Sequence, residues 1–233
     1  MFNFDFYNPT HISFGQGCIA QLEQFVPAEA KVMVLYGGQS AQRTGTLGEV
    51  QRALGTRSVY LFGGIEANPT YETLMQAVHI ARAEQIDFLL AVGGGSVIDG
   101  TKFVAAAVPY PDEPWNILLT GGRDIQAALP IGTVLTLAAT GSEMNNGSVI
   151  TRSTLQSKLP FHSNFVFPKF SMLDPSKSFT LPERQVANGI VDAFVHVIEQ
   201  YLTYPVNAPV QDRFAEGLLQ TLVEQGPLAL SQP

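Results

Sequence analysis

Short, continuously apolar runs alternate along most of the chain with segments of helical periodicity. The runs KVMVLYGG (31–38), RSVYLF (57–62) and DFLLAV (87–92) are strand-like, and each is followed by or ends in glycines. Before the third run, apolar residues recur at the spacing of one helical face, at Leu74, Ala77, Val78 and Ala81. Strands that are apolar throughout and alternate with helices indicate a parallel sheet covered on both faces. The pattern therefore predicts an α/β fold.

Local signals predict further elements around this frame. FNFDFY (2–7) alternates Phe with polar residues and predicts a strand. A helix is expected from about residue 40 to 54. The pair Asn68-Pro69 predicts another helix, with Asn as the N-cap and Pro at the first helical position. Residues 108–130 are rich in Pro, Gly and polar side chains and predict a long loop.

The chain changes character after LPERQ, which follows a last strand expected around 169–173. Residues 182–225 show helical patterns only. We therefore predict two domains, an α/β domain over residues 1–180 and a helical segment over 181–233. Neither internal repeats nor low-complexity segments interrupt this organisation.

Composition excludes several classes of function. The chain has 233 residues, of which 45% are hydrophobic and 14% charged, and its net charge is −7. No basic patch stands out among 13 Lys and Arg, so we expect no nucleic-acid and no membrane partner. The single cysteine, Cys18, excludes an internal disulfide and fits a reducing compartment. With no signal-peptide pattern at the start, the sequence predicts a cytoplasmic protein.

The segment AVGGGSVID (91–99) is the strongest local signal for a cofactor site. Gly93, Gly94 and Gly95 lie between a predicted strand and a predicted helix. Residues without a Cβ let a ligand approach the backbone, and the amides that open the helix at Ser96 suit a phosphate. The spacing matches neither G-x-G-x-x-G nor a Walker sequence. A tight strand-to-helix turn without a ligand explains the same residues.

A second glycine turn, YGGQS (36–40), bears on cofactor choice. In dinucleotide folds an acidic residue near such a strand end binds the ribose hydroxyl and repels a 2′-phosphate. Here Gly37 and Gly38 stand in that region, Ser40 offers a hydroxyl and Arg43 a positive charge. If a dinucleotide binds, this turn favours NADP over NAD. The alternative is that Ser40 is a plain helix N-cap.

The segment TLAATGSE (136–143) carries three hydroxyl groups on one short loop. Thr136, Thr140 and Ser142 could bind a ribose or a phosphate. A turn whose hydroxyls are satisfied within the protein is the alternative.

A carboxylate and an imidazole, Asp192 and His196, stand four residues apart in the predicted helix NGIVDAFVHVIEQY. This spacing places them on one helical face, where they could hold a metal ion. On the spacing alone, a solvent-facing polar stripe on an amphipathic helix is the favoured explanation. A metal site usually takes three or four protein ligands, and the other histidines do not pair at a ligand spacing; they are His11, His79 and His162.

Several motifs in combination resemble the iron-type alcohol dehydrogenases, and in particular their NADP-dependent butanol dehydrogenase and aldehyde reductase branch. The resemblance covers essentially the whole chain. The motifs are FGQG (14–17), YGGQS (36–40), GGIEANPTYETL (63–74), LLAVGGGSVIDGTKF (89–103), LTLAATGSE (135–143), LDP (173–175), LPERQVANGIVDAFVHVIEQY (181–201) and QDRFAEGLL (211–219).

The resemblance implies an N-terminal α/β domain that binds NADP and an all-helical domain that binds a divalent metal, iron or zinc. It implies hydride transfer between NADP(H) and a primary alcohol or aldehyde, with the metal polarising the substrate oxygen, and we expect a homodimer. Asp192 and His196 would be metal ligands, with no further catalytic residue in the chain. The cofactor-binding positions implied are Gly37, Gly38, Ser40, Asn68, Gly94, Gly95, Ser96, Asp99, Thr136, Thr140, Ser142 and Lys158.

One departure from the family pattern leaves alternatives open. Family members use two further histidines in the helical domain, and this chain stops at Pro233 before any match to them. The chain therefore resembles the cofactor domain and the beginning of the metal domain. The alternatives are a truncated, non-catalytic nucleotide-binding remnant and a glycerol or polyol dehydrogenase relative.

Overall fold

A computed structural model describes residues 3–205 and 207–231. The chain divides into two compact units, Met1–Lys177 and Ser178–Pro233. The division falls close to Thr180, where the sequence changes from alternating strands and helices to helices alone.

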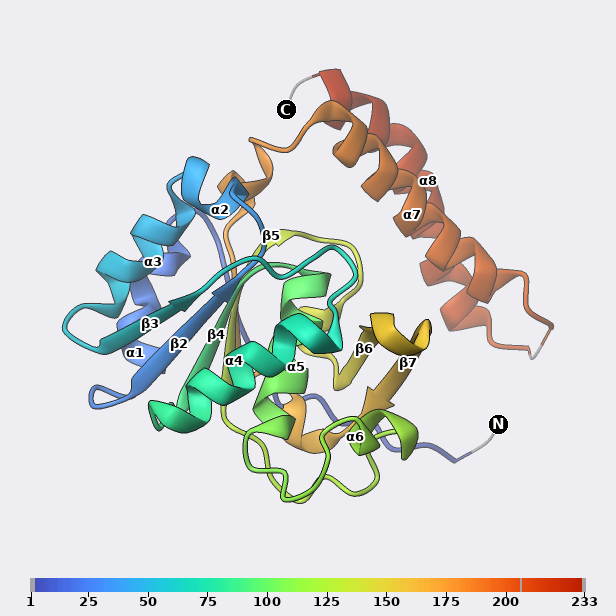
Figure 1. Ribbon diagram of the computed structural model, residues 1–233. Helices are drawn as coiled ribbons and strands as arrows, with labels where there is room; N and C mark the ends of the chain where they lie inside the picture. Colours follow the sequence, from blue (N-terminus) through green and yellow to red (C-terminus); the bar gives the residue numbers. More distant parts are fainter. Residues whose placement is uncertain (1–2, 206, 232–233) are drawn as a thin grey trace. The chain divides into compact units, whose positions relative to one another are not determined.

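The first unit is built on a six-stranded sheet in which every neighbouring pair is parallel (Figure 1). This confirms the α/β class predicted from the continuously apolar runs. From one edge to the other, the strands are β1 (His11–Phe14), β8 (Phe170–Leu173), β5 (Ile131–Leu137), β4 (Phe88–Gly94), β2 (Lys31–Tyr36) and β3 (Ser58–Phe62).

Side chains along each strand point alternately to the two faces of the sheet, and both faces are covered by apolar cores. Leu89 and Ala91 of β4 belong to a core with α4 (Tyr71–Ala83) and α5 (Gly95–Ala107). The intervening Leu90 belongs to a second core with α1 (Leu22–Phe25) and α3 (Thr46–Leu54). Successive strand residues point to opposite faces, so a sheet with helices on both faces requires apolar residues at every position.

Shorter elements complete the first unit. An antiparallel hairpin of β6 and β7, which the sequence patterns did not reveal, packs against α5. Short helices precede or connect the strands. These elements are η1 (Cys18–Gln21), α2 (Ser40–Arg43), α6 (Asn116–Leu119), η2 (Ser142–Met144), β6 (Gly147–Arg152), η3 (Ser153–Leu155), β7 (Ser157–His162), η4 (Asn164–Val166) and η5 (Pro175–Ser178).

Two predictions in the N-terminal third are wrong. Residues 3–7 of the FNFDFY segment form no strand, and Phe2 lies outside the described residues. The first strand is β1 instead, because it finds a hydrogen-bonding partner in β8. The single helix expected over 40–54 is two helices, α2 and α3, since Gly45 has a left-handed backbone with φ of 80°.

The start of α4 and the following connection also differ from prediction. Thr70, and not Asn68, is the N-cap of α4, and its Oγ1 accepts the N–H of Thr73 at 3.3 Å. The helix therefore begins at Tyr71, after the proline. Residues 108–130 are mostly irregular, as predicted, but they include the short helix α6.

The second unit consists of two helices that pack on each other, α7 (Glu183–Tyr201) and α8 (Pro209–Ser231). Gly226 of α8 permits this approach, because a Cβ there would lie 3.0 Å from Ile190 Cγ2. An apolar groove of about 300 Å³ runs between the helices, and none of the described α7 residues is buried. Among the described residues, no helix is long and apolar enough to cross a membrane.

Candidate nucleotide-binding site

The strand order places a switch point at the carboxyl ends of β2 and β4. The chain passes from β2 to β3 on one side and then returns to β4 on the other side of β2 (Figure 1). In open parallel sheets, ligands bind in the crevice formed where the order reverses in this way. The first glycine turn predicted from sequence begins at Gly37, directly after β2, whereas Gly93 and Gly94 are the last residues of β4 and Gly95 is the first of α5.

Three loops adjoin at this switch point. The carbonyl of Gly37 accepts the N–H of Gly64, which follows β3, at 2.8 Å. A Cβ at Gly37 would lie 3.5 Å from Val97 Cγ2 on α5. Ser96 Oγ, in the first turn of α5, donates to the carbonyl of Ala67 at 2.8 Å. The loops after β2, β3 and β4 are therefore joined by direct contacts into one surface.

The N-terminus of α5 supplies the amides of this surface. Gly94 is the N-cap, and within the described part of the chain no side chain caps it. The first N–H groups of the helix thus keep the partial positive charge that attracts a phosphate. A Cβ at Gly93 would lie 2.6 Å from Val97 Cγ2, and a Cβ at Gly95 would overlap the side chain of Thr140. Packing therefore requires glycine at both positions.

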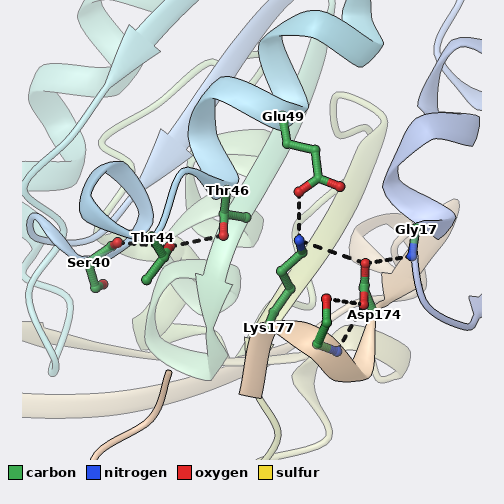
Figure 2. Close-up of polar contacts among 8 residues, drawn as sticks. Gly17, Ser40, Thr44, Thr46, Glu49, Asp174 and Lys177 are labelled. Atoms are coloured by element: carbon green, nitrogen blue, oxygen red, sulfur yellow. Dashed lines mark hydrogen bonds and ion pairs between the residues drawn. The ribbon is translucent and has the colours of Figure 1, made fainter. Parts of the chain in front are cut away.

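Ser40 lies at the beginning of α2, on the turn after β2. The interpretation of Ser40 as an N-cap is wrong, because Gln39 occupies that position. Ser40 is exposed, and its carbonyl accepts from Thr44 N at 2.9 Å and from Thr44 Oγ1 at 3.0 Å. Thr44 Oγ1 in turn lies 3.0 Å from Thr46 Oγ1 at the start of α3 (Figure 2). Backbone contacts thus fix this turn and leave the Ser40 side chain exposed.

Two predicted residues from distant segments meet at the edge of the site. Lys158 Nζ on β7 donates to Asn68 Oδ1 at 2.8 Å, and both residues are exposed. The hairpin is held there because Thr151 N donates to the carbonyl of Pro69 at 3.0 Å. An ammonium group therefore lies beside the loop that follows β3.

Asp99 and Ser142 form the start of a buried polar network. The Ser142 hydroxyl donates to Asp99 Oδ1 at 2.6 Å, and the N–H of Val149 donates to Asp99 Oδ2 at 3.0 Å. Burial raises the pKa of Asp99 more than these hydrogen bonds lower it. Both carboxylate oxygens and the hydroxyl proton are therefore engaged within the protein. Thr136, at the end of β5, is half-buried.

The sequence patterns missed the centre of this network, Lys102. Its side chain is fully buried, and Nζ donates to Ser142 Oγ at 2.9 Å, Asn145 Oδ1 at 2.9 Å and the Gly147 carbonyl at 2.8 Å. Desolvation lowers the pKa of Lys102 to about 8. The available signal was a lysine in a helix whose neighbours are otherwise apolar and small.

The two predicted metal ligands lie on α7 of the second unit. His196 Nε2 is 3.6 Å from Asp192 Oδ2, and both side chains are at least half exposed. Over residues 3–205 and 207–231, no group of three His, Cys, Asp or Glu is arranged to hold a metal ion. These donors fit part of a metal site, and the described chain does not complete one.

The fold and the switch-point surface define a dinucleotide-binding unit of the parallel α/β class. The family model for iron-containing alcohol dehydrogenase matches residues 9–175, and the chain belongs to this family. The resemblance inferred from the motifs is thereby confirmed.

Close relatives agree with this assignment. NADPH-dependent aldehyde reductase YqhD of Escherichia coli (strain K12) is 57% identical over 235 residues, which cover 100% of this chain and 61% of the relative. A crystal structure of E. coli K-12 YqhD superposes with a TM-score of 0.95, covering 99% of this chain and 60% of that one. NADH-dependent butanol dehydrogenase B of Clostridium acetobutylicum is 39% identical, over 100% of this chain and 60% of the relative. The chain thus spans about three fifths of the length of these relatives.

Proposed function

We propose that the first unit binds NADP(H) and that the chain is part of an oxidoreductase interconverting a primary alcohol and an aldehyde. The observation that carries the proposal is the convergence of three loops at the switch point, around a helix N-terminus that no described side chain caps. The names of the relatives, an aldehyde reductase and a butanol dehydrogenase, support the reaction class.

The pyrophosphate, the adenosine ribose and its 2′-phosphate each have a proposed partner. The amides of Gly94, Gly95 and Ser96 hold the pyrophosphate, because they open α5 at the carboxyl end of β4. Gly37 and Gly38 leave room for the adenosine ribose, and the exposed Ser40 binds its 2′-phosphate.

The remaining predicted residues form the walls of the site. Lys158 and Asn68 border it on the hairpin side, where the ammonium group favours a negatively charged ligand. Thr136 and Thr140 line the side formed by the loop after β5. We assign Asp99 to the wall as well, since its carboxylate oxygens are already hydrogen-bonded within the protein.

We propose Asp192 and His196 as two donors to a divalent metal, iron or zinc. These two residues would hold the ion, which would supply Lewis-acid polarisation of an aldehyde oxygen, and the reduced nicotinamide would supply the hydride. Carboxylate and imidazole suit either metal. A homodimer and a cytoplasmic location stay predictions from the sequence.

A nucleotide-binding protein without catalysis is the second candidate. It is favoured by the metal site, where the described residues provide only the two donors on α7. The isolated chain is expected to lack turnover under both candidates, so the coding sequence separates them: an in-frame continuation past Pro233 that carries a pair of histidines favours the first.

Titration of the purified chain with NADPH and NADH, followed by nicotinamide fluorescence, tests the proposal. We expect tighter binding of NADPH, and we expect Ser40→Ala to weaken NADPH binding while leaving NADH binding unchanged. Ser58→Ala is the matched control, because Ser58 is exposed at the amino end of β3, away from the carboxyl ends of the strands. Absence of binding, or equal affinity for both nucleotides, contradicts the proposal.

A further inference from the structure

Lys102 places a buried positive charge close to the proposed phosphate site. It is among the largest fully buried side chains of the chain and lies on α5, whose N-terminus opens the site. Burying an ammonium group is unfavourable unless its N–H groups are paired. The three acceptors of Lys102 all belong to one segment, residues 142–147. The lysine thus fastens that segment to the side of α5.

Residues 142–147 lie shortly after Thr140, the residue whose side chain packs against the N-terminus of α5. Ser142 N donates to Thr140 Oγ1 at 3.3 Å, which links the segment to the turn before it. The side chain of Thr140 packs against Gly95, the first residue of α5. A path of direct contacts therefore runs from Lys102 through Ser142 to Thr140 at the proposed pyrophosphate position.

The hydrogen-bond directions at Ser142 show that its hydroxyl oxygen depends on Lys102 as a donor. Its hydroxyl donates to Asp99 and accepts from Lys102, so its one proton is already used. Asn145 Oδ1 accepts from Lys102 Nζ and also from the N–H of Gly147, which folds the segment back on itself. Without the ammonium group, Ser142 Oγ, Asn145 Oδ1 and the Gly147 carbonyl would lose their shared donor.

We propose that Lys102 is a positioning residue for the dinucleotide phosphates: it holds residues 140–147 so that Thr140 forms one wall of the α5 N-terminus. Lys102 itself is fully buried, so its proposed effect on binding is indirect. The inference rests on the proposed NADP(H) site. It assigns a function in binding to a residue that is not among the predicted cofactor contacts.

The affinities for two ligands of different length distinguish a role of Lys102 in positioning the phosphate site from a general role in stability. NADPH spans the pyrophosphate position, whereas adenosine 2′-monophosphate reaches only the proposed Ser40 end of the site. The affinity of the full chain for each is measured by calorimetry in Lys102→Met and in Asn145→Ala. Asn146→Ala is the matched control, because Asn146 lies in the same segment but donates to Asn164 and not to the lysine network.

We expect Lys102→Met to weaken NADPH binding about tenfold, which corresponds to about 1.4 kcal/mol. Asn145→Ala, at an exposed position that preserves the core, removes the two hydrogen bonds that Asn145 Oδ1 accepts and should weaken NADPH binding about threefold to fivefold. Binding of adenosine 2′-monophosphate should be unchanged in both variants, and Asn146→Ala should match the unsubstituted chain for both ligands. If circular dichroism shows that Lys102→Met does not fold, Asn145→Ala decides.

Two results overturn the inference while leaving the proposed function intact. In one, the unsubstituted chain binds NADPH and the variants bind it equally well. In the other, the variants lose affinity for both ligands by the same factor, which indicates a general structural role. If the unsubstituted chain binds neither ligand, the proposed function fails and the inference fails with it.

Discussion

Substitution of Gly38 by aspartate tests how the site distinguishes NADP from NAD. Gly38 lies on the exposed turn between β2 and Ser40, and a Cβ placed there meets no described atom within 4 Å. Its φ is outside the left-handed region, so an aspartate is accommodated without backbone strain. The change therefore adds a carboxylate beside the proposed 2′-phosphate position and leaves the fold unaltered.

The expected loss of affinity follows from electrostatics. Adjacent Cα atoms are about 3.8 Å apart, so a carboxylate on residue 38 lies on the order of 6 Å from a phosphate held by Ser40. Two unit charges about 6 Å apart repel by roughly 2.8 kcal/mol at an effective dielectric of about 20 and by roughly 0.7 kcal/mol in water. The turn is exposed, so we expect an intermediate loss of about 1.4–2 kcal/mol, or about tenfold to thirtyfold in Kd.

Fluorescence titration of NADPH into Gly38→Asp and Gly38→Asn measures this effect, because asparagine has the same shape without the charge. The difference between the two variants should shrink as salt is raised above about 0.1 M, where the Debye length falls below about 10 Å. NADH affinity should be equal in both variants or higher in Gly38→Asp, where the carboxylate can accept a hydrogen bond from the ribose hydroxyl. Equal NADPH affinity of the two variants at low salt would show that no 2′-phosphate binds near this turn.

Further predictions concern the rest of the chain. The purified chain should show negligible NADPH-dependent reduction of butanal even with added Fe²⁺ or Zn²⁺. The described residues offer only two metal donors on an exposed helix face, whereas a metal site usually takes three or four protein ligands. Turnover at the rate of full-length relatives would contradict this. Asp174→Asn should lower the free energy of unfolding by about 2 kcal/mol, because the buried carboxylate accepts from Gly17 N and from Ser176 (Figure 2). Burial opposes ionisation of Asp174, but hydrogen bonds from Ser176 and Gly17 lower its pKa overall. The ionised carboxylate therefore stabilises the fold above pH about 4, and this contribution is lost as the pH falls through the folded pKa. Urea unfolding measured at a series of pH values follows the loss. Burial lowers the pKa of Lys102 to about 8 from its ordinary 10.5, while Asp99 and Glu143 oppose the shift. Between these two pKa values the unfolded chain binds more protons than the folded chain, so the free energy of unfolding should rise as the pH is raised from about 8 to 10.5. The rise should be smaller in Lys102→Met. The chain should bind a hydrophobic dye through the apolar groove between α7 and α8, whereas a chain ending at Lys177 should not; a monodisperse full chain without dye binding refutes this.

Local sequence patterns were sufficient for the class of fold. In KVMVLY the residues after Lys31 are all apolar, and this pattern is typical of strands that are buried on both faces. The glycines after β2 and β4 were visible for the same reason, because the absence of a side chain is itself a sequence feature. The predicted strand is absent over residues 3–7, since alternation of Phe and polar residues does not provide a neighbouring strand to hydrogen-bond with.

Helix boundaries show the limit of local signals. Asn68 and Thr70 both have side chains that can cap a helix, and the sequence pattern favoured Asn68 because Pro69 follows it. In the structure Asn68 accepts a hydrogen bond from Lys158 on β7 instead, and Thr70 caps α4. The choice between the two caps depended on the hairpin, which the sequence patterns did not reveal.

The candidate site itself was decided by the tertiary structure. The sequence marked single turns, but only the strand order brings the turns after β2, β3 and β4 to one switch point. Likewise, nothing in the spacing of Lys102 shows that it is buried among the acceptors of residues 142–147. Glycine content and apolar periodicity are properties of neighbouring residues, whereas strand order and the burial of a charge depend on contacts between residues far apart in the chain. The sequence alone therefore determined the class of fold and the family, and tertiary packing determined the remaining elements and which side chains meet.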